Sequence, residues 1–164
     1  MRQVFVILLA MLAGCSSRSD NGVSPATDGE RQTRRLQSYA QDISSSTGNL
    51  KVRHDAPFAV DVIVKNIGPD PWLSGGQPGD KAGWVDVSYR WLDASGAEML
   101  IEGKRTLLAP REMLGPGESA NVKLQIVAPP NAGRFTLRVS MVHEGVTWFY
   151  NAGGKPLDLS VTVD

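Results

Sequence analysis

The stretch 58–65 reads FAVDVIVK, and every second residue in it is phenylalanine or valine. Successive side chains of a β-strand point to opposite faces, so this period of two predicts a strand with one buried face. The same period recurs in VDVSYRW (85–91), VKLQI (122–126), FTLRVSM (135–141) and LDLSVTV (157–163). Five half-buried strands are therefore predicted before any other feature of the chain is considered.

Working outward from these strands, weaker alternation predicts further strands at 37–44, 50–53 and 98–107. Turn-forming residues separate the strands, namely 66–69 (NIGP), 94–96 (ASG), 115–118 (GPGE) and 129–133 (PPNAG). No segment shows a helical stripe. Short strands divided by such turns predict an all-β, immunoglobulin-like sandwich of seven to eight antiparallel strands. Tyr89 and Trp91 are in phase with the buried side of their strand, so we expect them at its centre.

The N-terminal residues predict an export signal. Arg2 is followed by nine apolar residues, too few for the roughly 20 that a membrane-spanning helix needs. Leu12-Ala13-Gly14-Cys15 resembles a bacterial lipobox, and the resemblance implies cleavage before Cys15 and acylation of that residue. We therefore expect a signal peptide at 1–14, a lipidated flexible tether at 15–35 and the sandwich domain at 36–164. An ordinary secretory signal with a chance cysteine is the alternative.

The tether is expected because residues 16–35 hold almost no large apolar side chain, and so cannot offset the entropy of ordering. Ser16 follows the cysteine, and in Gram-negative lipoproteins a small neutral residue there implies transport to the outer membrane. The lipid is thus expected to bind the protein to the membrane through Cys15. Because Cys15 is the only cysteine, no disulfide is expected in the fold.

Composition argues against several classes of partner. The chain has 17 basic and 17 acidic residues, and removing residues 1–14 takes away only Arg2. This balance argues against nucleic acid, which requires a strongly basic surface. The two histidines, His54 and His143, lie far apart without cysteine or acidic neighbours at metal-ligand spacing, so neither a metal site nor a cofactor is expected.

The chain is not expected to be an enzyme, because no Gly-x-Ser-x-Gly elbow or facing pair of carboxylates is evident. His143 is in phase with the buried residues of 135–141, so we expect it to hold a loop backbone rather than act as a base. The loop 75–81 (GGQPGDK) lacks the Gly-Lys-Ser/Thr ending of a phosphate-binding loop and is interpreted as a flexible loop. Arg105 and Glu144 are expected to form a structural ion pair.

A family resemblance covers most of the folded region. The matching segments, in chain order, are VKNIG (64–68) with Trp72, SYRWLD (88–93) with Gly96, GKRTL (103–107), PGE (116–118), AP (128–129) with Gly133, and HEGVTWF (143–149). Together they resemble a bacterial Ig-like domain found beside polysaccharide-building glycosyltransferases and methyltransferases. They are also similar in outline to the carbohydrate-binding domains of O-antigen exporters. The resemblance implies a glycan ligand, but much of the pattern is turn chemistry that concerns the fold alone.

Aromatic residues are the candidate ligand-binding groups. Sugar rings stack their C–H faces on flat aromatic side chains while neighbouring polar groups bind the hydroxyls. Trp72 and Trp84, which flank the loop 75–81, and Tyr150 are the candidates, and the alternative for the two tryptophans is simple packing at the end of the sandwich. Trp148 is expected to be core or edge cover.

These observations predict a non-enzymatic, lipid-anchored protein of the outer membrane whose Ig-like domain binds an envelope partner, with polysaccharide placed first. The alternative is a protein-interaction or assembly module of an envelope or secretion machine that uses an exposed strand edge or a loop end.

Overall fold

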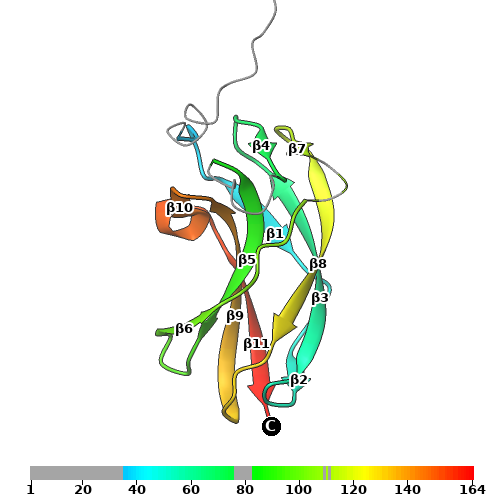
Figure 1. Cartoon of the computed structure of the whole chain (residues 1–164), viewed down its shortest axis with the longest axis vertical. Coiled ribbons are helices and arrows are strands. Elements are labelled where there is room, and N and C mark those ends of the chain that lie inside the picture. The colour runs from blue at the N-terminus through cyan, green and yellow to red at the C-terminus, as the bar shows by residue number, and fades with distance from the viewer. Residues whose placement is uncertain (1–34, 76–82, 109, 111) are drawn as a thin grey trace, which may run out of the picture.

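The computed structural model describes residues 35–75, 83–108, 110 and 112–164, and these residues form two main β-sheets that pack face to face (Figure 1). Sheet A has three strands in the order β1 (Gln41–Ser44), β3 (Pro57–Asn66) and β8 (Ser119–Val127). Sheet B has the order β2 (Leu50–Val52), β11 (Leu157–Val163), β9 (Gly133–His143), β5 (Val85–Leu92) and β6 (Glu98–Glu102), with β10 (Thr147–Trp148) also pairing β9. The signal peptide at 1–14, Cys15 and nearly all of the tether lie outside the described residues.

The order of the strands is that of an immunoglobulin-like sandwich. The first part of the chain contributes to both sheets, because β1 pairs with β3 whereas β2 lies parallel to β11, the last strand. The other pairs of the two sheets are antiparallel. Eight of the described strands have three residues or more. The predicted all-β class and the predicted seven to eight strands are therefore confirmed.

Alternation of side chains builds the core, as the sequence predicts. The buried positions of β3 and β8 face those of β5, β9 and β11, and they include Val60, Val62, Val64, Val122, Leu124, Ile126, Val87, Leu137, Val139, Met141, Leu159 and Val161. Burial of each such side chain stabilises the fold by about 1.5–3 kcal/mol relative to exposure. The core thus stabilises the sandwich without a disulfide in the described residues.

Tyr89 and Trp91 lie at the centre of the sandwich, which confirms the prediction from their phase. Both are buried, and both reach across to the end of β8. The Trp91 indole N–H donates to the carbonyl of Val127 at 3.1 Å, and the Val127 N–H donates to the Tyr89 hydroxyl at 3.2 Å. These aromatic side chains therefore fill the core and also bind the polar backbone at one edge of sheet A.

The predicted turn at 66–69 holds one end of the sandwich together through Asn66, whose side chain is fully buried. Its amide nitrogen donates to the carbonyls of Asp70 (2.8 Å) and Leu114 (3.0 Å), and its amide oxygen accepts from the N–H of Gly68 (3.0 Å). A small ladder, β4 (Trp72–Leu73) with β7 (Met113–Leu114), closes this end of the molecule. A 3-10 helix, η1 (Phe149–Ala152), follows β10.

Candidate binding site

The outer face of sheet B gathers charged and aromatic side chains. β5 and β9 are in register with Arg90 opposite Arg138, and both side chains point away from the core. Two like charges directly opposite each other destabilise a sheet unless acidic groups accompany them. Residues from β6, β10, η1, β11 and two connecting segments accompany these arginines, and we call the whole set the sheet B platform: Arg90, Glu98, Glu102, Arg105, Arg138, Glu144, Trp148, Tyr150 and Asp158.

The two arginines that face each other are each held by carboxylates. Arg90 pairs with Glu102 at 3.0 Å and with Glu98 at 3.5 Å. Arg138 binds Asp158 of β11 through two parallel hydrogen bonds of 2.9 and 2.7 Å. This bidentate geometry fixes the guanidinium plane, and the hydrogen bonds to Asp158 raise the pKa of Arg138 against the opposing effect of burial.

Arg105 links the connection after β6 to the loop after β9. It pairs with Glu102 at 2.6 Å and forms a short hydrogen bond with Glu144. Burial alone would lower the pKa of Arg105, but its hydrogen bonds to the two carboxylates outweigh burial and raise the pKa. The ion pair predicted between Arg105 and Glu144 is therefore confirmed, and it fixes the position of the loop.

The aromatic part of the platform is Trp148 and Tyr150. Trp148 is 8% exposed, and the guanidinium carbons of Arg90 and Arg105 lie 4.9 and 5.2 Å from the centre of its ring. The prediction that Trp148 is cover rather than ligand contact is therefore confirmed.

Tyr150 is half-buried, so part of its ring meets solvent. Its hydroxyl donates to Glu98 at 2.6 Å, and the guanidinium of Arg138 lies 5.5 Å from the ring centre. Burial and the hydrogen bond to the Glu98 carboxylate raise the pKa of Tyr150 to about 12. The ring is therefore neutral at physiological pH and is held in one orientation.

The expectation that Trp72 binds a ligand is wrong. Its side chain is 0% exposed and lies in the hydrophobic core, where its ring packs edge-on against Phe149 with 5.2 Å between ring centres. The pairing of Trp72 with Leu114 turns the indole inward to close the end of the sandwich. Packing, the alternative for this residue, is what the structure shows.

Trp84 lies immediately before β5 and is half-buried, with its carbonyl accepting the N–H of Glu144 at 2.8 Å. A Cβ on Gly75 would lie 3.8 Å from the indole, so the ring stands beside the beginning of the loop 75–81. A role in ligand binding remains a prediction for Trp84. The loop 75–81, predicted to be flexible, lies outside the described residues except for Gly75.

His143 has the structural role that the sequence predicts. It is 2% exposed at the end of β9, and it forms a hydrogen bond with the backbone of Gly83. Its Nδ1 lies 3.4 Å from the Tyr39 hydroxyl. Burial lowers its pKa, with the hydrogen bond to Gly83 acting in the opposite direction. The neutral imidazole thus fastens the segment before β5 to the end of β9.

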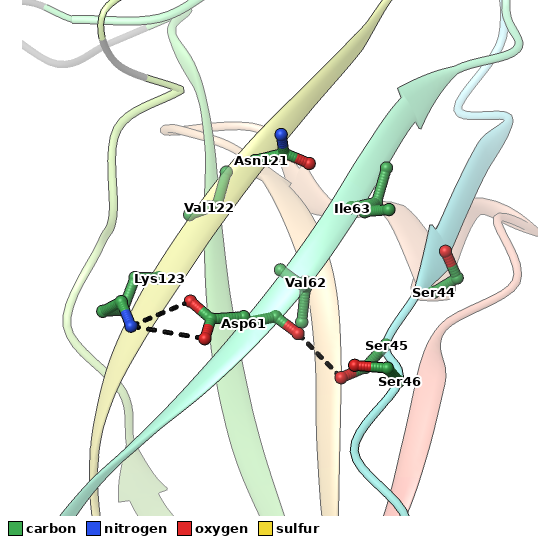
Figure 2. A pocket seen from close by; sticks show the side chains of 9 residues that line it. All are labelled: Ser44, Ser45, Ser46, Asp61, Val62, Ile63, Asn121, Val122 and Lys123. Carbon is green, nitrogen blue, oxygen red and sulfur yellow. Dashed lines mark hydrogen bonds and ion pairs between the residues drawn. The ribbon is translucent and has the colours of Figure 1, made fainter.

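A second surface with a depression lies on the outer face of sheet A, and it was not predicted from the sequence (Figure 2). It is an open depression of about 690 Å³ beside the half-exposed side chain of Ile63. Asp61 pairs there with Lys123 at 3.1 Å, and the Ser45 hydroxyl donates to the carbonyl of Asp61 at 2.7 Å. In the sequence, the run of three serines at 44–46 is the feature that could have indicated this surface.

Within the described part of the chain, no helical segment has the length and apolar character needed to cross a bilayer. The described residues also contain no cluster of three or more histidine, cysteine or carboxylate side chains that could hold a metal ion.

In comparisons with known proteins, no family model matches the chain, and no curated protein matches it significantly. Among solved structures, a CARDB domain from Pyrococcus furiosus in complex with di-metal ions is similar at 18% identity and a TM-score of 0.44, over 76% of this chain and 90% of that one. A β-glucosidase from Listeria innocua in complex with glucose is similar at 12% identity and a TM-score of 0.40. That match covers 74% of this chain and 16% of the enzyme. Likenesses this weak carry no argument about ligand or activity.

Proposed function

We propose that the protein is a non-enzymatic, lipid-anchored binding domain of the bacterial envelope, and that it binds polysaccharide on the sheet B platform at Tyr150. One observation carries the proposal. A part-exposed aromatic ring is held among a guanidinium and carboxylates on a rigid sheet face, with Glu98 and Arg138 as its neighbours. A pyranose requires such a combination, because the ring offers an apolar surface and the charged groups bind hydroxyls.

Preorganisation supports this choice of surface. The side chains around Tyr150 are already fixed by ion pairs, so ordering them on ligand binding would cost little conformational entropy. The removal of Trp72 from the candidates leaves Tyr150 and Trp84 as the part-exposed aromatic residues that the sequence singled out. Tyr150 has charged neighbours in Glu98 and Arg138.

The experiment compares Tyr150→Ala with Tyr150→Phe in binding to polysaccharide purified from the producing cell. We expect Tyr150→Ala to weaken binding at least tenfold, because the stacking surface is lost. Tyr150→Phe keeps the ring and should retain most of the affinity. Near-ultraviolet circular dichroism checks that both variants are folded. Unchanged binding by Tyr150→Ala would refute the platform as the glycan site.

The anchor is tested separately. We expect Cys15→Ser to release the protein from the membrane fraction and to abolish incorporation of labelled palmitate, since each buried methylene contributes about 0.8 kcal/mol to anchoring. Membrane association that persists in this variant would contradict lipidation of Cys15. This outcome would leave the platform proposal untouched.

A second candidate function, docking of an envelope protein, is favoured by Leu100. This side chain is fully exposed on β6, on the same face as Glu98 and Glu102, at a point where the register with β5 shifts. An exposed apolar anchor ringed by polar groups is typical of protein interfaces. We expect Leu100→Asp to abolish recovery of a defined protein partner if this function holds, and to leave polysaccharide binding unchanged.

A further inference from the structure

The four edge strands of the two main sheets differ in how they are protected. Within the described residues, β2 has three residues, β1 has four, and β6 is interrupted by a bulge where its register with β5 shifts. Short strands and bulges are common ways to prevent edge-to-edge pairing. The edge strand β8 instead has nine residues, in unbroken register with β3 from Lys65–Ser119 to Pro57–Val127.

Hydrogen bonds at the end of β8 show which of its backbone groups face outward. In an antiparallel pair, every second residue bonds to the neighbouring strand and the residues between point the other way. The N–H of Ala128 donates to Ala56 at 3.1 Å, next to β3, whereas the N–H of Val127 turns to the Tyr89 hydroxyl. The odd-numbered residues of β8 therefore direct their backbone groups away from β3.

Besides Val127, β8 has four odd-numbered residues: Ser119, Asn121, Lys123 and Gln125. Across the described part of the chain, no backbone hydrogen bond outside the β3 ladder reaches any of these four residues. All four are exposed. β8 thus presents a straight row of outward-facing donors and acceptors, and a strand running beside it would satisfy them together.

We propose that β8 pairs with β8 of a second copy of this chain, antiparallel, with Asn121 opposite Lys123 of the second copy. Centring the pair on Lys123 would place two ammonium groups opposite each other, which is unfavourable. Moving the register toward Val127 would require groups already bonded to Tyr89 and Trp91. The register centred on Val122 satisfies all four open positions, with Ser119 opposite Gln125.

The side chains on the outer face are compatible with this register. Figure 2 shows Asn121 and Lys123 on β8 with the Asp61 carboxylate directed at the ammonium group. Each lysine of the pair is thus accompanied by its own carboxylate and stands opposite a neutral amide. The assembly is one six-stranded sheet with a two-fold axis at Val122, and its interface is isologous. Both sheet B platforms remain uncovered.

The first experiment is disulfide cross-linking in the full chain carrying Cys15→Ser, so that the introduced cysteines are the only ones. In the proposed register the Cα atoms of Asn121 and of Lys123 in the second copy lie about 5.5 Å apart, a span that a disulfide bridges. We expect mild oxidation to double the mass of Asn121→Cys/Lys123→Cys. The matched control, Ser119→Cys/Asn121→Cys, has no cysteines opposite each other and should remain a monomer on a denaturing gel.

The second experiment is sedimentation of the full chain with Asn121→Pro. Its N–H faces the open edge, so proline removes one donor from the interface and none from the β3 ladder. We expect the mass to halve relative to the parent chain while thermal unfolding stays within a few degrees. A parent chain that sediments as a monomer at about 100 µM, including one whose β8 binds a foreign strand instead, would overturn the proposal. Equal cross-linking of the control pair would also overturn it.

Discussion

The two outer faces of the sandwich are built by the same alternation of side chains, yet they differ in how their polar groups are held. On sheet B, carboxylates hold Arg90 over the ring of Trp148 and Arg138 over the ring of Tyr150. On sheet A, the ion pair of Asp61 with Lys123 is exposed, with 72% and 61% of the two side chains accessible. The comparison teaches that an identical strand pattern can present either a rigid, preorganised surface or an open one, depending on the segments that cross it.

The largest expected difference in stability between the two faces comes from removing one apolar side chain from each. Trp148→Ala should lower the free energy of unfolding by about 3 kcal/mol, because the buried ring supports two guanidinium groups. Ile63→Ala should cost less than about 1 kcal/mol, because the side chain is half-exposed. Urea unfolding of both variants measures the two costs. Equal costs would contradict the rigidity that we assign to sheet B.

Neutralising one ion-pair partner on each face should give a smaller difference in stability between the faces. Glu102→Gln removes the carboxylate shared by Arg90 and Arg105, and should cost about 1 kcal/mol. Lys123→Gln breaks only the exposed pair with Asp61, and should change stability by less than about 0.5 kcal/mol. Repeating the unfolding in high salt should reduce the first cost less than the second, because part-buried pairs are screened less.

Acid should loosen the His143 end of sheet B before it affects sheet A. The pKa of His143 is lowered by burial below the value of about 6.5 in the unfolded chain, so the unfolded state binds more protons. The stabilisation is therefore present above pH 6.5 and is lost as the pH falls through the folded-state pKa. Hydrogen exchange at pH 5 and pH 7 should show faster opening around His143 at the lower pH. The β3–β8 ladder serves as the internal control and should change little.

The smallest effect is a shift in the titration of Tyr150. Its absorbance at 295 nm should change with a midpoint near 12, because burial and Glu98 raise the pKa. Since the folded-state pKa exceeds the unfolded value of about 10, the stabilisation is complete below pH 10 and is lost as the pH rises through 12. Glu98→Gln should move the midpoint down toward 10. A midpoint that does not move would show that the carboxylate is not the partner of the hydroxyl.

The fold could be predicted from sequence because its signal is local. A period of two at 58–65 identifies β3, and the same reasoning places the strands that contain Tyr89 and Trp91. Trp72 was misplaced because β4 has only two residues, too few to show a period, and its direction depends on pairing with β7, more than 40 residues later. Sequence spacing alone did not fix its orientation.

The sheet B platform was only partly predictable for a similar reason. Arg105 with Glu144 and the aromatic run ending at Tyr150 were visible as isolated features. The contact between Tyr150 and Glu98 joins residues 52 apart in the chain, and it forms only because β6 and η1 both lie at one side of sheet B. Convergence of this kind depends on topology, which no local pattern specifies.

The pairing of β2 with β11 gives the molecule a mechanical property. These strands are parallel, with Leu50 opposite Val161 and Val52 opposite Val163, and the N–H of Asp164 continues the ladder to Val52. A force that pulls the two ends of the chain apart acts along this pair, so its hydrogen bonds are loaded together in shear instead of being opened one after another. The sandwich therefore resists tension applied between β2 and the last strand, β11.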